Sequence, residues 1–377
     1  MKDLKLIRWQ RKYLLQNGII TVVLVALFVL LSAFAFPKPV ETPEPPPVEE
    51  PVPVPVVYET APYDGRVEHI FFHPLIAYPE RAFDGDYQTQ GLDDYFVTVK
   101  EANAILQSLY EKGFMLVDIN RMFTVGEDGT LSQNVFDFPV GKKPLVISLD
   151  DVNYYEYMPQ HGMVTRLVLD EEGEIATESV SLSGEIEIRR DLEIIPILDQ
   201  FVKDHPDFSF EGAKGSIGLT GYEGILGYRT QADSPNREAE IAAVKPIIKR
   251  LKETGWTFAS HSYGHYNTPD LSYDELLQDT KDWEDEVASL IGPTPIYLYP
   301  YGSGLKRTDA RMQILRDFGF KMLCHVGVES YINYAEDTIV LDRRHVDGIA
   351  FRQQRDLNLD LYDANEVFDP VRDNLPL

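Results

Sequence analysis

The sequence predicts an α/β fold in which a parallel sheet closes into a barrel of about eight strands. The first observation is that short apolar runs alternate with amphipathic stretches from about residue 60 onward. The second is the number of runs, about eight, which suits a closed barrel better than a short open sheet. The predicted strands are 69–73, 115–119, 145–149, 216–220, 257–260, 296–299, 321–325 and 338–341.

Amphipathic stretches between these runs predict the helices 97–113, 191–206, 238–255 and 273–292. The last follows Ser272 with Glu275 three residues on, which is the spacing of a capping box. Three of these helices end in glycine, as a helix C-terminus often does: Gly113, Gly255 and Gly292.

Two stretches interrupt the alternation and carry turn signals between β-type residues. Residues 124–141 contain Gly-Glu-Asp-Gly, and residues 166–190 contain Glu-Glu-Gly. Both are predicted to be hairpin insertions, and the second occupies about residues 156–190. We find no internal repeat in the sequence.

The N-terminal region predicts a membrane anchor followed by a stalk. A basic tail, 1–18, precedes the uncharged segment 19–36, which as a helix would rise roughly 27 Å, close to the thickness of a bilayer core. The basic flank should stay in the cytoplasm, which places the rest of the chain outside. A cleaved secretory signal is the alternative, since 33–35 reads Ala-Phe-Ala, and a buried core helix is a third. The Pro-rich linker 37–60 favours an extended polyproline conformation and leads to a catalytic domain over 61–377.

Composition excludes several classes of function. The 377 residues include 35 basic and 61 acidic side chains, a net charge of -26, so the chain lacks the basic character that a nucleic-acid binder needs. One cysteine, Cys324, permits no intramolecular disulfide and no cysteine-rich zinc site. A metal would therefore be held by His, Asp or Glu. The sequence has no Gly-x-Ser-x-Gly elbow, which disfavours a serine hydrolase.

Polar side chains follow the predicted strands at the points where they end. These residues are Asp150, Asp151, His261, Tyr301, His325, His73, Asp342 and His345, with His265 four residues after His261. In a barrel of parallel strands the active site lies at this carboxyl-terminal rim, so the side chains should converge there.

The combination of Asp151 or Asp150 with the two histidines predicts a catalytic metal site. At a spacing of four, His261 and His265 can point to one side and bind a divalent cation. A lone pair of this kind is more often two surface or capping histidines, and an Asp pair is often a turn or helix cap. One carboxylate and two histidines at successive strand ends leave positions open for water and substrate. Neighbouring side chains at a strand end diverge, so one aspartate can bind the metal while the other serves as a base.

With these residues the chain resembles the polysaccharide deacetylases, the NodB-homology group of carbohydrate esterase family 4, over roughly 143–345. Residues 148–152, Ser-Leu-Asp-Asp-Val, are similar to the first family motif, Thr-Phe-Asp-Asp-Gly. Residues 261–265 match the second motif, His-Ser/Thr-x-x-His, and Leu-Tyr-Pro-Tyr at 298–301 is similar to the third, Arg-x-Pro-Tyr.

The resemblance implies a distorted (β/α) barrel of about seven strands and a set of residue roles. Asp150 would be the catalytic base, and a divalent metal ion, expected to be Zn, would be held by Asp151, His261 and His265. The backbone amide of Tyr301 would stabilise the oxyanion. His325, in a Leu-x-His sequence like the last family motif, would be the general acid.

The chain also departs from the family pattern. Val152 replaces a glycine, and Leu298 replaces the arginine that orients the base, for which Arg229, Arg343 or Arg344 could substitute.

The general acid has three candidates. His325 matches the family motif but lies one strand early, so His345 and then His73 are the alternatives, and each could instead be a hydrogen-bonded structural histidine.

Aromatic residues near the predicted site have two interpretations. Tyr154, Tyr155, Tyr222 and Tyr228 could form a wall on which sugars stack, or they could be ordinary loop and core aromatics. The glycine-rich run 215–227 lacks phosphate-binding spacing and is predicted to be a strand with an active-site loop.

The sequence thus predicts an extracytoplasmic, membrane-anchored, metal-dependent deacetylase. Its substrate would be an N-acetylated polysaccharide such as peptidoglycan or an exopolysaccharide, with acetate and a free amine as products. The alternatives are a non-catalytic carbohydrate-binding wall protein on the same fold, and an O-acetyl esterase or amidase using the same site.

Overall fold

The computed structural model describes residues 58–374 except for 129, 335 and 336. The predicted basic tail, the predicted membrane helix and nearly all of the Pro-rich linker lie outside the described residues. Within the described part of the chain, no helix is both long and apolar enough to span a bilayer.

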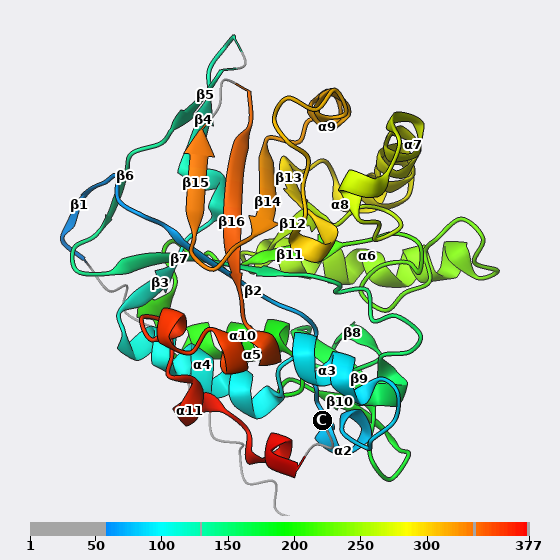
Figure 1. The fold of residues 1–377 in the computed structure, drawn as a ribbon. Coiled ribbons are helices and arrows are strands. Elements are labelled where there is room, and N and C mark those ends of the chain that lie inside the picture. The colour runs from blue at the N-terminus through cyan, green and yellow to red at the C-terminus, as the bar shows by residue number, and fades with distance from the viewer. Residues whose placement is uncertain (1–57, 129, 335–336, 375–377) are drawn as a thin grey trace, which may run out of the picture. The chain divides into compact units, whose positions relative to one another are not determined.

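Seven parallel strands close into a barrel, which confirms the predicted fold class (Figure 1). Their order around the barrel is β11-β12-β13-β14-β16-β2-β7, and β7 pairs again with β11. The barrel strands are β2 (Glu68–Phe72), β7 (Lys143–Leu149), β11 (Ser216–Leu219), β12 (Thr257–Ser260), β13 (Ile296–Leu298), β14 (Met322–Val326) and β16 (Ile339–His345).

One of the eight predicted strands, 115–119, lies in the sheet but outside the barrel. This strand, β3 (Phe114–Leu116), pairs with the first three residues of β7, whereas β11 pairs with Ser148 and Leu149 near the end of β7. One edge of β7 is therefore shared between two neighbours, and the ring closes through only two residue pairs. A further strand, β15 (Tyr331–Tyr334), pairs antiparallel with β16.

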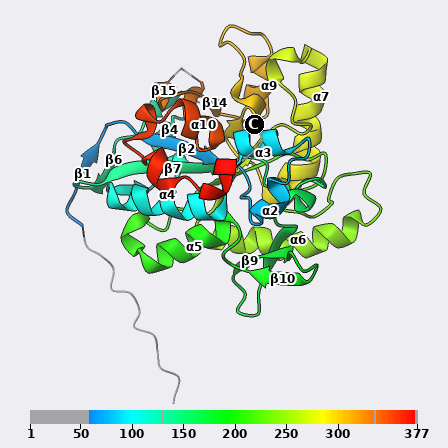
Figure 2. The ribbon, with the colours of Figure 1, turned by 60° about the horizontal axis from the view of Figure 1, so that its bottom comes forward.

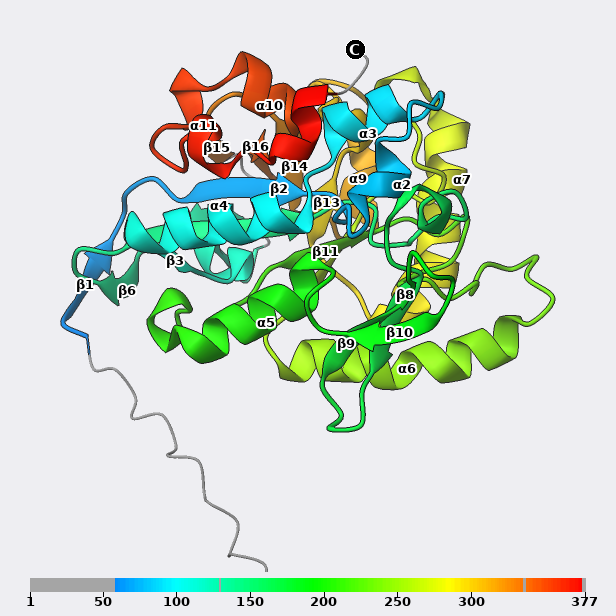
Figure 3. The same cartoon turned by 90° about the horizontal axis from the view of Figure 1, so that it is seen from below.

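Both predicted insertions form antiparallel structure. The first contains a hairpin and a strand that pairs with the start of the described chain, and the second is a three-stranded sheet beside α6 (Figure 3). These strands are β4 (Phe123–Val125), β5 (Leu131–Gln133), β1 (Thr60–Tyr63), β6 (Phe136–Pro139), β8 (Arg166–Leu169), β9 (Ile175–Val180) and β10 (Ile186–Arg189).

Helices cover the outside of the barrel, and α4 and α5 lie side by side (Figure 2). The capping box predicted at Ser272 and Glu275 is present at the start of α7. The helices are α2 (Pro79–Ala82), α3 (Thr89–Tyr95), α4 (Val99–Glu111), α5 (Ile194–Asp204), α6 (Arg237–Glu253), α7 (Tyr273–Trp283), α8 (Ser289–Ile291), α9 (Met312–Asp317), α10 (Gly348–Gln353) and α11 (Ala364–Val367). A single π-type turn, Glu284–Ala288, joins α7 to α8.

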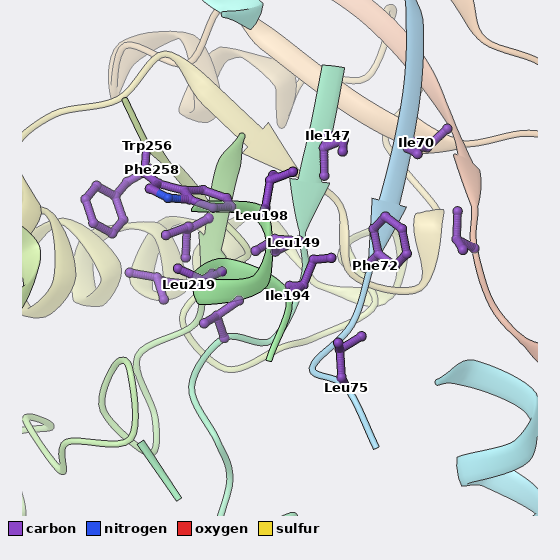
Figure 4. Close-up of a cluster of buried hydrophobic side chains, with 14 of the residues drawn as sticks. Ile70, Phe72, Leu75, Ile147, Leu149, Ile194, Leu198, Leu219, Trp256 and Phe258 are labelled. Atoms are coloured by element: carbon purple, nitrogen blue, oxygen red, sulfur yellow. The ribbon is translucent and has the colours of Figure 1, made fainter. Parts of the chain in front are cut away.

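The side chains of β7 alternate between the outside and the inside of the barrel. They therefore belong to two separate apolar clusters, and the same alternation points Asp150 inward. Ile147 and Leu149 pack outward against Ile194 and Leu198 of α5 (Figure 4). Val146 belongs to the separate cluster that fills the barrel. Because side chains alternate between the two faces of a strand, the next inward position after Val146 is Ser148, and the one after that is Asp150.

Candidate metal and catalytic site

Asp150 and Asp151 directly follow β7 and are both buried, with exposed fractions of 3% and 7%. The backbone N–H of Asp150 donates to the Phe72 carbonyl at 2.9 Å, so Asp150 still continues the strand ladder. Asp151 has a positive φ of 59°, which turns the chain away from the strand. The two carboxylates therefore leave the same strand end in different directions, as predicted.

The two predicted histidines reach Asp151 from the end of β12. His261 Nε2 lies 3.8 Å from Asp151 Oδ1, and His265 Nε2 lies 3.6 Å from the same oxygen. Ser262 and His265 both have positive φ, so the connecting loop coils tightly enough to return the second imidazole to the first. The structure thus brings together the three residues predicted to hold a metal.

Asp279, which the sequence motifs did not indicate, holds this loop in place. Its buried carboxylate accepts hydrogen bonds from the Ser262 hydroxyl at 2.9 Å and from the backbone N–H groups of Tyr263 and Gly264 at 3.1 and 2.8 Å. Burial raises the pKa of Asp279 despite these bonds. The sequence does contain a signal for this residue. Asp279 lies three residues after Leu276 and four before Trp283, which places a carboxylate on the apolar face of the helix.

The donor set fits a divalent cation. One ligand atom from each of Asp151, His261 and His265 can be chosen so that all lie within 4.8 Å of one another. His261 Nδ1 lies 2.8 Å from the Leu298 carbonyl, which can only accept, so Nδ1 carries the proton and Nε2 presents a lone pair to the site. Two imidazoles and one carboxylate are a common ligand set of catalytic zinc.

Asp150 is held by Arg343, which fills the place of the arginine missing at Leu298. Arg343 is fully buried and donates to both carboxylate oxygens of Asp150, at 2.6 and 3.0 Å. Burial alone would raise the pKa of Asp150, but the Arg343 guanidinium and nearby His261 more than offset it and hold that pKa well below its ordinary value. Asp150 is therefore ionised and fixed in orientation.

The other two arginines considered as substitutes have different partners. Arg229 donates to the backbone carbonyls of Glu223 and Tyr154. Arg344 pairs with Glu68 and Asp360. Both therefore support loops around the barrel, and neither contacts Asp150 among the described residues.

The tyrosines predicted as a sugar-stacking wall divide into two groups. Tyr154 and Tyr228 are buried in the apolar core, so for these two the wall interpretation was wrong. Tyr155 is also buried, and its hydroxyl donates to Asp151 Oδ1 at 2.7 Å. Tyr222 stacks on Tyr155 with 5.1 Å between ring centroids and remains 38% exposed.

The three candidate histidines occupy different surroundings. His73 Nε2 lies 4.0 Å from Asp151 Oδ2, and its buried Nδ1 has no hydrogen-bond partner among the described residues. His345 bonds Asp347 and Gln354. The His325 ring packs on Tyr299, outside the barrel, and the structure does not bring it to the aspartates.

Tyr301 follows β13 at the edge of the site. Its φ of 58° reverses the backbone after Pro300, and its ring centroid lies 4.9 Å from that of His265. The ring is 69% exposed, so it stands at the entrance rather than in the core.

Sequence comparison finds a family model that matches part of the chain. Residues 229–323 match the model of the polysaccharide deacetylase family, a segment that contains both histidines of the metal set and Tyr301. Together with the geometry at the rim, this match supports a polysaccharide deacetylase domain of the NodB type in this part of the chain, which confirms the resemblance predicted from the motifs. No curated protein matches the chain.

Several solved structures are similar to this chain at low identity. The deacetylase PplD of Streptococcus pyogenes, solved in complex with acetate, is 12% identical, with 83% of this chain and 100% of that chain covered and a TM-score of 0.43. A de-N-acetylase from Aggregatibacter actinomycetemcomitans is also 12% identical, with 75% and 95% covered and a TM-score of 0.42. A family 4 pseudoenzyme from Bacillus anthracis is 13% identical, with 44% and 55% covered and a TM-score of 0.26.

Proposed function

We propose that this protein is a metal-dependent hydrolase that removes N-acetyl groups from a sugar polymer, releasing acetate and leaving a free amine. The observation that carries the proposal is the pairing of two adjacent carboxylates with different partners. Asp151 faces two histidines, and Asp150 is clamped by Arg343. Metal-dependent hydrolysis can use one carboxylate to hold the metal and a second one to accept the proton of the attacking water.

Asp151, His261 and His265 would hold the metal, with zinc as the expected ion. When bound, such an ion would polarise the acetyl carbonyl and acidify water. Asp279 holds the loop between the two histidines, and the Leu298 carbonyl holds the His261 imidazole, so the structure orients these ligands by its own hydrogen bonds.

Asp150 would accept the proton of the attacking water. The water oxygen forms a bond to the acetyl carbon, and the carbonyl oxygen becomes an oxyanion that the backbone N–H of Tyr301 would stabilise. Cleavage of the carbon–nitrogen bond then releases acetate, and the leaving nitrogen takes up a proton to become the amine. Arg343 keeps Asp150 ionised, which is the state that a proton acceptor requires.

For the general acid, the geometry favours His73 over His325, the first choice from the sequence motif. His73 lies at the end of a barrel strand beside Asp151, whereas the His325 ring contacts Tyr299. His73→Ala should therefore lower turnover more than His325→Ala when acetate release is measured for both.

We also propose that the domain works outside the cytoplasm, held by the segment 19–36. The support is the uncharged length of this segment and its basic flank. The mass of the mature N-terminus in a membrane fraction tests the anchor, and a chain that begins near Phe36 in the medium would instead mean a cleaved signal.

Acetate release from three substrates, with and without a chelator, tests the proposed reaction. N-acetylglucosamine oligomers and peptidoglycan carry N-acetyl groups, and O-acetylated xylan carries esters. The proposal predicts release from an N-acetylated polymer that stops with chelator. Release from xylan alone would favour an esterase, and glycan binding without any release would favour a non-catalytic binding protein.

A further inference from the structure

A row of aromatic rings leads from the metal site to the protein surface. The row begins with the stacked rings of Tyr222 and Tyr155. Tyr157 follows, with its ring 6.3 Å from that of Tyr155 and nearly parallel to it, at 21°. His161 follows at 6.1 Å from Tyr157, and Tyr87 follows at 6.4 Å from His161. We call Tyr222 and Tyr87, which are exposed, and Tyr157, which is partly buried, the tyrosine strip.

The outer end of the strip is an exposed ring on a firmly tied loop. Tyr87 is 85% exposed, yet the Asp86 carboxylate beside it accepts the backbone N–H groups of Gln88 and Thr89. The other oxygen of Asp86 lies 3.1 Å from His161 Nε2, which joins the loop to the row. The backbone that carries the ring is therefore held in place while the ring stays exposed, and this lowers the entropy cost of binding a ligand on it.

The charge of the segments that carry the strip favours a neutral ligand. Residues 83–89, 154–161 and 220–224 contain no lysine or arginine. They do contain the acidic residues Asp84, Asp86, Glu156 and Glu223. An anionic polymer would be repelled there, whereas the apolar face of a neutral sugar ring can stack on tyrosine while its hydroxyls stay hydrated.

We propose that the tyrosine strip binds the sugar units of a neutral, linear N-acetylated glycan that extend beyond the unit at the metal site. This inference rests on the proposed function and deepens it. Buried Tyr155 links the two, because its hydroxyl contacts Asp151 while its ring supports Tyr222. The substrate is therefore a polymer segment several sugars long, and not a free monosaccharide or disaccharide.

The dependence of kcat/KM on chain length tests this proposal. The full-length chain is assayed with N-acetylglucosamine oligomers from dimer to hexamer, and the ratio of hexamer to dimer is compared between variants. Tyr87→Ala should lower this ratio by about three- to tenfold, the size of one aromatic contact. Tyr87→Phe should restore it, since the ring face remains.

A matched control separates the strip from a general surface effect. Tyr273→Ala removes another exposed tyrosine, on α7, and should leave both the ratio and the basal activity unchanged. An unchanged ratio in Tyr87→Ala, or failure of Tyr87→Phe to restore it, would overturn the strip.

A binding measurement keeps the proposal testable even if no acetate is released. In an Asp150→Asn background, calorimetric titration should show weaker hexamer binding after Tyr87→Ala. Equal binding of the hexamer by both variants, or equally tight binding of polygalacturonate, would contradict a neutral-glycan strip. If hexamer binding depends on Tyr87 while the protein with Asp150 intact releases no acetate, the strip is supported and only the proposed reaction is contradicted.

Discussion

Two buried arginines, Arg372 and Arg343, have different roles in this molecule. Arg372, near the end of the described chain, uses all five N–H donors on Asp93, Glu101 and two backbone carbonyls. Arg343, at the barrel rim, clamps Asp150, whose Oδ2 also lies 3.9 Å from His261 Nε2. The first cluster is closed, and the second leaves one carboxylate facing the site.

This difference shows how a buried charge that stabilises the fold can be distinguished from one that serves the reaction. The Arg372 cluster ties the C-terminal segment to α3 and α4, and its guanidinium has no N–H donor left for a ligand. The Arg343 cluster lies where Asp151, Ser262, His265 and Tyr301 all adopt positive φ, a strained backbone concentrated at one rim. We therefore expect changes in the two clusters to affect different measurements.

The largest effect is expected from removing both imidazoles of the metal set. His261→Ala/His265→Ala should lose bound metal and acetate release together, because one carboxylate alone is a weak site. Metal analysis of the purified protein decides this. Full retention of metal in the double variant would disprove the assigned site.

Removing the guanidinium of the closed cluster should act on stability instead. Arg372→Ala leaves Glu101 buried without its cation and Asp93 with Arg352 alone, and it should lower the free energy of unfolding by about 3–5 kcal/mol. Urea unfolding measures this loss, while metal content per folded molecule should be retained. Unchanged stability would remove the distinction between the two clusters.

A smaller effect is expected at the carboxylate that supports the metal loop. Asp279→Ala should weaken metal binding about 10- to 100-fold, because the loop between the two histidines loses three hydrogen bonds. Asp282→Ala is the control, since Asp282 on the same helix accepts from Gln278 at the surface. Metal affinity is measured by competition with a chelator. Equal metal affinities in the two variants would exclude a positioning role for Asp279.

Glu193 is a buried carboxyl that has no cationic partner among the described residues, which extends the comparison. Glu193 accepts hydrogen bonds from the backbone N–H groups of Leu75 and Ile194, and burial raises its pKa to about 8. The folded protein therefore keeps this proton while the unfolded chain loses it near its ordinary pKa of 4.5. The stabilisation is complete below pH 4.5 and is lost as the pH rises toward about 8.

Glu193→Gln imitates the protonated form and should remove this pH dependence. Between pH 6 and 7 the free energy of unfolding of the wild type should fall relative to the variant by about 1.4 kcal/mol. Urea midpoints measured at several pH values give the difference. Parallel pH profiles of the two proteins would show that Glu193 is ionised in the folded state.

The sequence was sufficient for most of the barrel because apolar runs and caps are local signals. All eight predicted strands lie in the sheet, yet only the register shows that β3 stays outside the ring. The motif spacing located Asp151 and the two histidines. It could not choose Arg343, because that choice depends on which face of β16 points into the barrel, toward the end of β7. The same cause misdirected the choice of His325, which the strand alternation turns out of the barrel.

The central claim is that Asp150 and Asp151, adjacent in sequence, have different roles, and one paired measurement tests it. Metal content and acetate release per folded molecule are measured for Asp150→Asn and Asp151→Asn. Asp151→Asn should lose metal, because a neutral amide is a poorer ligand. Asp150→Asn should keep metal and lose about 10²–10⁴ in turnover, since only the proton acceptor is removed. Full activity in metal-loaded Asp150→Asn, or a loss of stability alone in both variants, would contradict the account.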